Sequence, residues 1–276
     1  MSRHGRLCVG IDPHSWLLHD WGLPDSAAGA RDFALTVVEA CAGTVGMVKP
    51  QVAFFERFGS AGIAVLEEVI REARSAGLLV IADAKRGDVG STVAAYAEAW
   101  LERGAPLESD AMTISAFQGV GSIAGPIDLA CRTGKGLFVL AATSNPEGVP
   151  LQQAIVRAGE HHGSTVSRAI VEDVAASNRD RLPGARIGSI GVVIGATLDL
   201  ADFGLDAAPH ARDPVLPVLA PGFGYQGASV ERAAAVFGAL SPGVIVSESR
   251  SVLGAGPEGL ALAITSRAEK VKESIV

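Results

Sequence analysis

The chain is poor in cysteine and has no long apolar run. Its 276 residues include only 3 cysteines, which are widely spaced and odd in number: Cys8, Cys41 and Cys131. This spacing fits neither a disulfide framework nor a zinc site, and it is typical of a reduced intracellular protein. No apolar stretch reaches the roughly 18 residues that a spanning helix needs, and the first residues are too polar for a signal peptide. The sequence therefore predicts a cytoplasmic protein without a membrane segment.

Charge is also scarce and has a negative balance. Charged residues make up 19% of the chain, and the formal net charge is −7. This balance argues against nucleic acid or an anionic membrane as the main partner. The chain has no Walker motif, no complete dinucleotide-binding glycine pattern and no metal-ligand spacing. We therefore expect a small-molecule ligand, no nucleic acid, no membrane and no metal.

Glycine is plentiful, and apolar β-branched runs alternate with helical patterns. The chain has 33 glycines, which indicate many tight turns or backbone close to a ligand. The strand candidates are Leu7–Ile11, Thr44–Val48, Leu78–Ala82, Ala111–Ile114, Gly136–Ala141, Ile190–Ile194, Pro214–Leu219 and Val244–Val246. The helical stretches include Ala27–Cys41, Ala61–Ser75, Thr92–Glu102, Leu151–Ser177, Ala228–Leu240 and Pro257–Lys272.

This alternation predicts a single (β/α)8 barrel, the TIM-barrel architecture. Dividing 276 residues among eight units leaves about 34 residues each, enough for one strand, one helix and two short loops. Continuous apolar strands are typical of a parallel sheet covered by helices. An open doubly wound sheet is the structural alternative. No linker or shift in composition divides the chain, so we expect one domain over residues 1–276.

Charged side chains gather where the first three predicted strands end. Asp12 follows the first strand, Lys49 the second, and Asp83 and Lys85 the third, with Asp88 in the next loop. Active sites of such barrels lie at these strand ends. Dense charge costs desolvation energy that stability alone rarely repays, which favours a reaction site over mutually satisfied ion pairs. A lysine between carboxylates stays protonated, which suits a proton donor and not a Schiff base. The opposite strand ends show no comparable gathering of charge.

The loops after the seventh and eighth strands are candidates for binding phosphate. Residues 221–227 read Pro-Gly-Phe-Gly-Tyr-Gln-Gly, and Ser249-Arg250-Ser251 follow the last strand. Loops at these positions of a barrel often bind phosphate through backbone N–H groups. Arg250 could add a bidentate contact, and Gln226 could reach the same oxygens.

Five segments together resemble orotidine 5′-phosphate decarboxylase, in its bacterial type 2 branch. Asp83-Ala-Lys85-Arg-Gly-Asp88-Val matches that family's Asp-x-Lys-x-x-Asp motif. The other segments are Val-Gly-Ile-Asp-Pro (9–13), Val-Lys-Pro-Gln-Val-Ala-Phe-Phe-Glu (48–56), Thr-Ser-Asn-Pro-Glu (143–147) and Ala-Pro-Gly-Phe-Gly-Tyr-Gln-Gly (220–227). The resemblance implies conversion of orotidine 5′-phosphate to UMP and CO₂, the last step of pyrimidine nucleotide synthesis, with no cofactor.

The resemblance also implies roles for the charged residues. Lys85 would stabilise the carbanion at C6 of the pyrimidine and then protonate it, with Asp83 beside the departing carboxylate. Lys49 and Asp12 would bind ribose hydroxyls and complete the charge network. Asp88 would hold Lys85 and reach a ribose hydroxyl across a homodimer interface. Thr92 would act with Asp88 at the same interface.

For the rest of the substrate, the resemblance implies a pyrimidine contact from Ser144. Gln226, Arg250 and the backbone of Ser249 would bind the phosphate. Two segments depart from the family pattern: Ser-Glu-Ser-Arg at 247–250 and Ser-Ala-Phe-Gln-Gly at 115–119. Two other functions remain open, a sister sugar-phosphate decarboxylase or aldolase-type barrel, and a non-catalytic nucleotide-binding protein.

Overall fold

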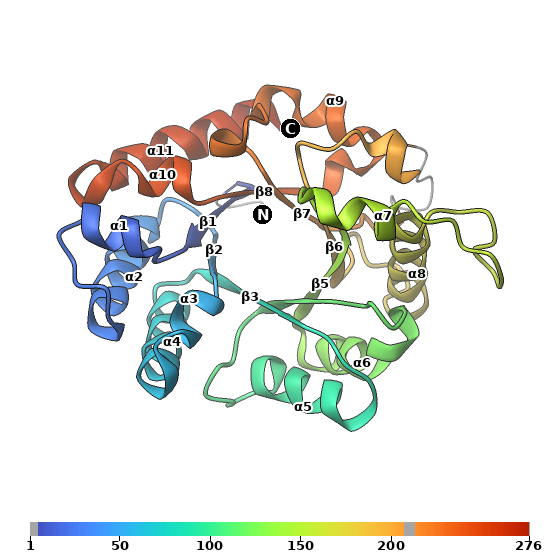
Figure 1. Ribbon diagram of the computed structural model, residues 1–276, viewed down its shortest axis with the longest axis horizontal. Coiled ribbons are helices and arrows are strands. Elements are labelled where there is room, and N and C mark those ends of the chain that lie inside the picture. The colour runs from blue at the N-terminus through green and yellow to red at the C-terminus, as the bar shows by residue number, and fades with distance from the viewer. Residues whose placement is uncertain (1–4, 207–212, 276) are drawn as a thin grey trace.

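Parallel strands close into a barrel with helices around its outside (Figure 1). The computed structural model describes residues 5–206 and 213–275. Within them the barrel order is β1 to β8, each strand beside the next and β8 beside β1. The strands are β1 Leu7–Ile11, β2 Met47–Pro50, β3 Leu79–Arg86, β4 Ala111–Ile114, β5 Gly136–Ala142, β6 Ile190–Ile194, β7 Val218–Pro221 and β8 Val244–Glu248. The predicted (β/α)8 barrel is confirmed, and the open sheet is wrong.

The helices follow the strands and cover the outside of the barrel. They are α1 Ser15–Asp20, α2 Ala27–Cys41, α3 Ala53–Glu56, α4 Gly59–Ser75, α5 Gly90–Leu101, α6 Ala124–Thr133, α7 Val149–Gln152, α8 Val166–Arg181, α9 Ala233–Phe237, α10 Arg250–Leu253 and α11 Gly256–Ser274. The helix predicted at Ala27–Cys41 is found with the same bounds. Its N-cap Ser26 accepts a hydrogen bond from the N–H of Gly29, which satisfies one free donor of the first turn.

Alternate side chains along each strand point into the barrel or outward to the helices. One buried interior layer takes one residue from every strand: Cys8, Met47, Ile81, Ala111, Phe138, Val193, Leu219 and Ile245. Their neighbours, such as Val48 and Val80, pack in the larger core beneath the helices. Two residues beyond the interior layer come Lys49, Asp83 and Thr113. The period of two therefore points these three polar side chains into the mouth of the barrel.

Two strands, β2 and β7, begin well after their predicted starts, whereas β3 begins at Leu79, next to its predicted start at Leu78. In the stretch before β2, the N–H groups of Thr44 and Val45 bond back to the carbonyl of Cys41, so these residues still belong to the turn after α2. In the stretch before β7, Pro214 and Pro217 lack the N–H that a ladder requires. Both shifts move the strand start toward the mouth and leave the charged and glycine-rich ends in place.

The helix predicted over 151–177 is wrong in its first half. The chain leaves α7 after Gln152 and returns through an antiparallel bridge between Ile155 and Thr165 before α8 begins. Gly159 and Gly163 adopt φ of 80° and 87°, which interrupts any helix there. The helix predicted over 228–240 is also broken, into 3₁₀ turns and the short α9, by Gly238 at φ 46°.

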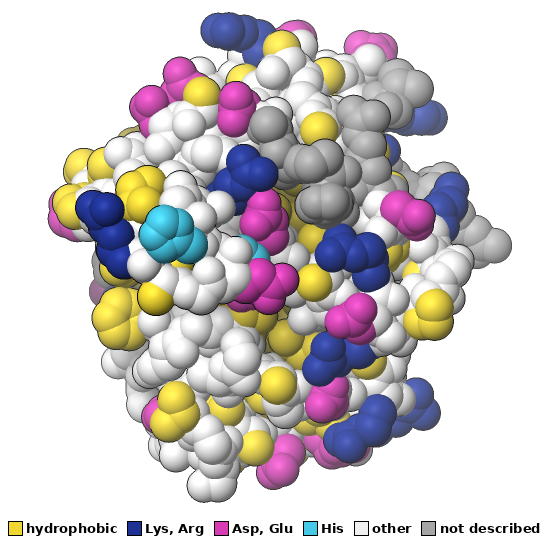
Figure 2. Space-filling model, turned by 90° about the vertical axis from the view of Figure 1, so that its right-hand side faces the viewer, with side chains coloured by type: hydrophobic (Ala, Val, Ile, Leu, Met, Phe, Trp, Pro, Cys, Tyr) yellow, Lys and Arg dark blue, Asp and Glu magenta, His cyan; other side chains and the backbone are white. Residues whose placement is uncertain are grey.

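Figure 2 shows the flank of the molecule that carries α8. On the part of this face that the structure describes, basic and acidic side chains are interspersed, and no basic stripe runs across it. The mixed charge is typical of a solvated protein surface. Among the described helices, none combines the length and apolarity needed to cross a membrane.

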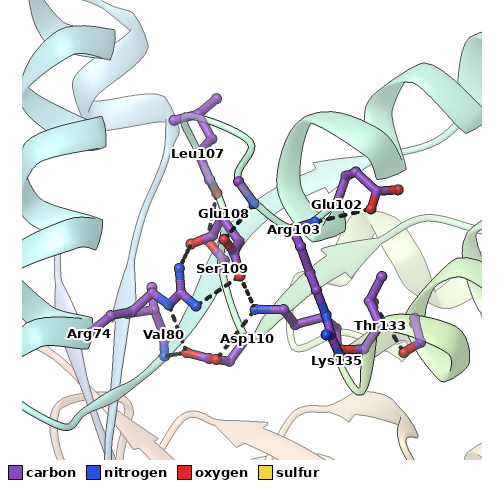
Figure 3. Close-up of polar contacts among 12 residues, drawn as sticks. Arg74, Val80, Glu102, Arg103, Leu107, Glu108, Ser109, Asp110, Thr133 and Lys135 are labelled. Carbon is purple, nitrogen blue, oxygen red and sulfur yellow. Dashed lines mark hydrogen bonds and ion pairs between the residues drawn. The ribbon is translucent and has the colours of Figure 1, made fainter.

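A second charge cluster lies at the opposite end of the barrel (Figure 3). Glu108 Oε1 accepts hydrogen bonds from Arg74 and Lys135, both at 2.8 Å, and Lys135 also lies 3.7 Å from Asp110. The hydrogen bond from Lys135 is the main reason that the pKa of Glu108 falls to about 2. The expectation that this end gathers no comparable charge is therefore wrong. The sequence does not reveal this cluster because its members are far apart along the chain: Arg74 belongs to α4, and the other residues precede β4 and β5.

Candidate active site

A cavity of about 540 Å³ opens at the carboxyl ends of the strands. Eight of the ten predicted site residues line it: Asp12, Lys49, Asp83, Lys85, Ser144, Gln226, Ser249 and Arg250. One wall carries the charged residues of β1 to β3. Apolar side chains of β5, β6 and β7, among them Leu140, Val193 and Leu219, line another part. The cavity therefore joins a charged half to an apolar half, with glycine-rich loops at its rim.

Asp83 lies at the centre of the charged wall. Lys49 Nζ donates to its Oδ2 at 2.6 Å, and Lys85 Nζ donates to its Oδ1 at 2.5 Å. The hydroxyl of Thr113 donates to the same Oδ1 at 2.9 Å. The side chains of Asp83 and Lys49 are nearly buried, while that of Lys85 is 45% exposed. Because its side chain is the more exposed of the two lysines, Lys85 is the cation of this group that a bound ligand would contact.

Burial and charge oppose each other in this group. Burial alone would raise the pKa of Asp83, but the charges of Lys49 and Lys85 outweigh it and hold the pKa well below its usual range. Burial alone would lower the pKa of Lys49, but the charges of Asp83 and Asp12 outweigh it and raise the pKa. Both groups are therefore ionised at neutral pH. The site holds fixed, dry charges before any ligand arrives.

Lys85 reaches the cavity through an unusual backbone. Its φ is +47°, the one non-glycine residue in this region among those described, and the β3–β4 register shifts between Ala82 and Arg86. A regular strand was expected to place Asp83 and Lys85 on one face. Both do line the cavity, but Lys85 does so through this bulge. Its N–H donates to Thr113 Oγ1 at 2.9 Å, which holds the strained turn in place.

Asp12 and Ser249 carry buried polar atoms that have no partner in the described chain. These are Asp12 Oδ1 and Ser249 Oγ. They meet above Gly10, where an added Cβ would lie 2.7 Å from the Cβ of Ser249 and 3.2 Å from Asp12 Oδ1. At the cavity wall, both oxygens are placed where they can take part in hydrogen bonds with a bound ligand or with water. The short distances from an added Cβ show that close packing requires glycine at position 10.

The predicted phosphate loops lie together at the rim. Ser144 Oγ donates to Gln226 Oε1 at 3.5 Å, which brings the loops after β5 and β7 into contact. The guanidinium of Arg250 stacks on the ring of Tyr225 at 4.0 Å from its centroid. Gly222 adopts φ 111° and Gly224 φ 67°, conformations that only glycine takes without strain. These loops bring the amide of Gln226 and the cation of Arg250 to the same cavity.

Asp88 and Thr92 do not line the cavity of their own chain. Asp88 Oδ1 accepts a hydrogen bond from the neighbouring N–H of Val89, and Thr92 is exposed on the first turn of α5. Within the described chain Lys85 is held by Asp83 and not by Asp88. The expected contact between Asp88 and Lys85 is therefore not made within the described chain.

Several cavity residues were not singled out from the sequence. Thr113 is one, although its place two residues beyond an interior strand residue signals it. Gln51 donates through Nε2 to the carbonyl of Asp83 at 3.3 Å. Glu248, in the segment that departs from the family pattern, borders the cavity although its side chain is fully buried. Phe117 is 74% exposed and places the divergent 115–119 loop at the cavity rim. In the described residues no group of histidine, cysteine and acidic side chains is arranged to hold a metal.

Comparison with known proteins shows the family of the chain. The family model described as Orotidine 5′-phosphate decarboxylase / HUMPS family matches residues 5–258. An orotidine 5′-phosphate decarboxylase from Streptomyces coelicolor is 51% identical over 95% of this chain and 90% of its own, and one from Salinispora tropica is 49% identical over the same shares. A solved structure of a candidate orotidine 5′-phosphate decarboxylase from Streptomyces avermitilis has a TM-score of 0.90 and 47% identity, covering 100% of this chain and 93% of that one. The chain therefore belongs to the orotidine 5′-phosphate decarboxylase / HUMPS family.

Proposed function

We propose that the chain converts orotidine 5′-phosphate to UMP and CO₂ without a cofactor. The observation that carries this proposal is the array Lys49–Asp83–Lys85, facing a cavity whose rim holds the phosphate loops. The identity of about 50% to curated enzymes of this name supports it. The reaction supplies UMP, so we also propose that it serves pyrimidine nucleotide synthesis.

The charged wall supplies the chemistry of the reacting carbon. Loss of CO₂ leaves an electron pair on C6 of the ring, and a cation fixed beside that carbon stabilises it as it forms. Lys85 is this cation, and it then donates a proton from Nζ to C6. Asp83 binds the Lys85 ammonium through Oδ1 and the Lys49 ammonium through Oδ2. Both lysines are therefore already in place and need not move during the reaction. In this proposal the departing carboxylate lies beside Asp83.

The remaining walls bind the parts of the substrate that do not react. Asp12 Oδ1 accepts a hydrogen bond from a ribose hydroxyl, and Ser249 Oγ donates one to a phosphate oxygen; neither buried atom has a partner among the described residues. Gln226 and Arg250 bind phosphate oxygens, and Ser144 faces the pyrimidine. The apolar half excludes water from the ring. Binding at the phosphate thus contributes energy at a distance from C6, where it aligns the ring against Lys85.

We further propose a homodimer in which Asp88 and Thr92 of one subunit complete the site of the other. Their position outside their own cavity supports this arrangement. Val89 is 51% exposed and Tyr96 36% exposed on the same βα segment, which is apolar surface suited to a subunit contact. The uninterrupted barrel supports one catalytic domain, and the three free cysteines favour a reduced, cytoplasmic location.

The direct experiment follows the orotate-ring absorbance of orotidine 5′-phosphate after addition of purified protein. Loss of that absorbance, with UMP and CO₂ as products, is expected. Lys85→Ala should lower kcat by about 10²–10⁴-fold, the usual contribution of a proton-transferring group. Turnover of a sugar phosphate instead, or tight UMP binding without turnover, would contradict the proposal. A variant that keeps more than about a hundredth of the activity would contradict the role of Lys85.

A further inference from the structure

Glu248 is a buried carboxylate in a layer that is otherwise apolar. It ends β8, where Ile245 and Ser247 point into the barrel and the alternate residues Val244 and Val246 pack outward under the helices. The same alternation sends Glu248 outward, and its side chain has 0% exposure. Acidic side chains are almost never fully buried unless they are paired. Its partners therefore tell what the carboxylate does.

The first partner is Arg267 of α11. Its Nε donates to Glu248 Oε1 at 2.6 Å, and its Nη2 donates to the same oxygen. Leu260, Ile264 and Val271 are the buried residues of this helix, and Arg267 falls on their stripe. A position that would normally carry an apolar side chain thus holds a cation. A buried ion pair thus joins α11, which packs outside the barrel, to β8 of the barrel wall.

The second partner connects Glu248 to both phosphate loops. Ser251 Oγ donates to Glu248 Oε2 at 2.6 Å, one residue beyond Arg250. An added Cβ on Gly224, in the loop after β7, would lie 2.8 Å from Ser251 Cβ and 3.0 Å from Glu248 Oε2. The carboxylate is thus packed against one loop and hydrogen-bonded to the other. Movement of Glu248 would shift the backbone of both.

We propose that Glu248 is a positioning residue for the phosphate of the substrate, acting through Ser251 and Gly224 while Arg267 neutralises its charge. The inference rests on the proposed function, which assigns the phosphate to these loops. A buried ion pair contributes little net stability compared with well-packed apolar residues, so stability alone does not account for it. An anion beside a phosphate subsite is tolerated only when a cation holds it, which explains why the pair is complete and dry.

The test compares substrates with and without the phosphate. Glu248→Ala should lower kcat/KM for orotidine 5′-phosphate at least about tenfold, because the hydrogen bond from Ser251 to the carboxylate is lost. The same substitution should change kcat/KM for orotidine less than about twofold. Glu248→Gln, whose amide oxygen still accepts from Ser251, should recover part of the loss. The control is Glu269→Gln on the exposed face of α11. An equal loss for both substrates would show a merely structural role and overturn the proposal.

Two further variants guard against misfolding of the buried substitution. Ser251→Ala removes one hydroxyl and leaves the ion pair intact, and it should show the same selective loss with a smaller size. Arg267→Met leaves the carboxylate unpaired beside the phosphate and should weaken UMP binding more than it weakens uridine binding. Adding Glu248→Gln to Arg267→Met should restore part of the UMP affinity. No recovery in the double variant would contradict the charge-neutralising role of Arg267.

Binding measurements separate this inference from the proposed function. If the unaltered chain does not decarboxylate orotidine 5′-phosphate, the proposed function fails. The role of Glu248 is then decided by calorimetric affinities for UMP and uridine in the unaltered chain and in Glu248→Ala. A selective loss of UMP affinity supports it. An unaltered chain that binds uridine as tightly as UMP has no phosphate subsite and overturns it.

Discussion

Lys49 Nζ lies 2.6 Å from Asp83 Oδ2, and the two side chains are only 8% and 9% exposed. The pair joins β2 to β3 at the mouth of the barrel. Asp83 turns its other oxygen to Lys85 and Thr113, so one carboxylate orders three neighbours. Because the ion pair is nearly buried, removal of either charge has a measurable cost: Asp83 would keep only the half-exposed Lys85, and Lys49 would keep only the charge of Asp12.

The first prediction concerns this pair. Asp83→Ala should lower the free energy of unfolding by about 3–5 kcal/mol, since it removes the hydrogen-bonded counter-charge of the buried Lys49. Denaturant unfolding at neutral pH measures the change. The control, Asp128→Ala, removes an exposed ion pair with Arg181 and should cost no more than about 1 kcal/mol. Equal effects of the two substitutions would contradict the electrostatic account.

The second prediction concerns Thr113. Thr113→Val keeps the shape of the side chain but removes the hydroxyl that holds Asp83 and the N–H of Lys85. The loss of these hydrogen bonds should lower kcat about 10- to 100-fold, corresponding to about 1–3 kcal/mol, with a smaller effect on KM. Steady-state kinetics measures this, and Thr265→Val on the exposed surface of α11 is the control. An unchanged kcat would show that Lys85 needs no such support.

The third prediction concerns the glycine beneath Asp12 and Ser249. Gly10→Ala places a methyl group 2.7 Å from the Cβ of Ser249, closer than side chains normally pack, so Ser249 must move. We expect a raised KM and a weaker affinity for UMP, with the barrel still folded. Gly125→Ala, whose new methyl group meets nothing within 4 Å, is the matched control. A KM that matches the control would show that Ser249 can shift without loss of binding.

The fourth prediction concerns the pH dependence of stability and the segment of residues 153–165 that connects α7 to α8. His161 contacts Asp173 at 2.6 Å and Glu172 at 3.2 Å, and Glu172 also binds Arg168. The hydrogen bond to Asp173 is the main cause that raises the pKa of His161. Its contribution to stability is therefore complete below the unfolded pKa, about 6.5, and is lost as pH rises through the higher folded value.

Thermal melts across this pH range test the prediction. His161→Gln should lower Tm at pH 5.5, and the difference from the unaltered chain should shrink as the pH rises. His162→Gln at the exposed neighbouring position should show no such trend. A Tm difference that stays constant with pH would mean that the charge of His161 does not stabilise the contact of this connecting segment with α8.

The fifth prediction concerns the shared site. Lys85→Ala and Asp88→Ala should each be nearly inactive alone. After subunit exchange, half of the dimers are mixed, and each has one site with both residues intact, so about a quarter of the original activity should return. Labelled subunits confirm the exchange. No recovery despite exchange would contradict the contribution of Asp88 across the interface.

Local patterns sufficed for the barrel and for most of the charged wall. Strand runs such as Ile190–Ile194 are apolar on both faces, which is what a parallel sheet beneath helices requires. Asp83 and Lys85 were found from the sequence because the motif is contiguous and follows an apolar strand. The helix expected over 151–177 was wrong because its apolar spacing outweighed two glycines that need a left-handed backbone.

The order of apolar and polar residues along the chain determined the strands, the helices and the end of the barrel that carries the reaction. Only the closed barrel decided which residues meet. Thr113 reaches Asp83 across 30 residues of chain, Glu248 meets Arg267 on a helix outside the barrel, and Glu108 gathers two cations at the opposite end. Local propensity does not encode such contacts. They exist because closure brings distant strand ends side by side, where a buried charge must find its partner.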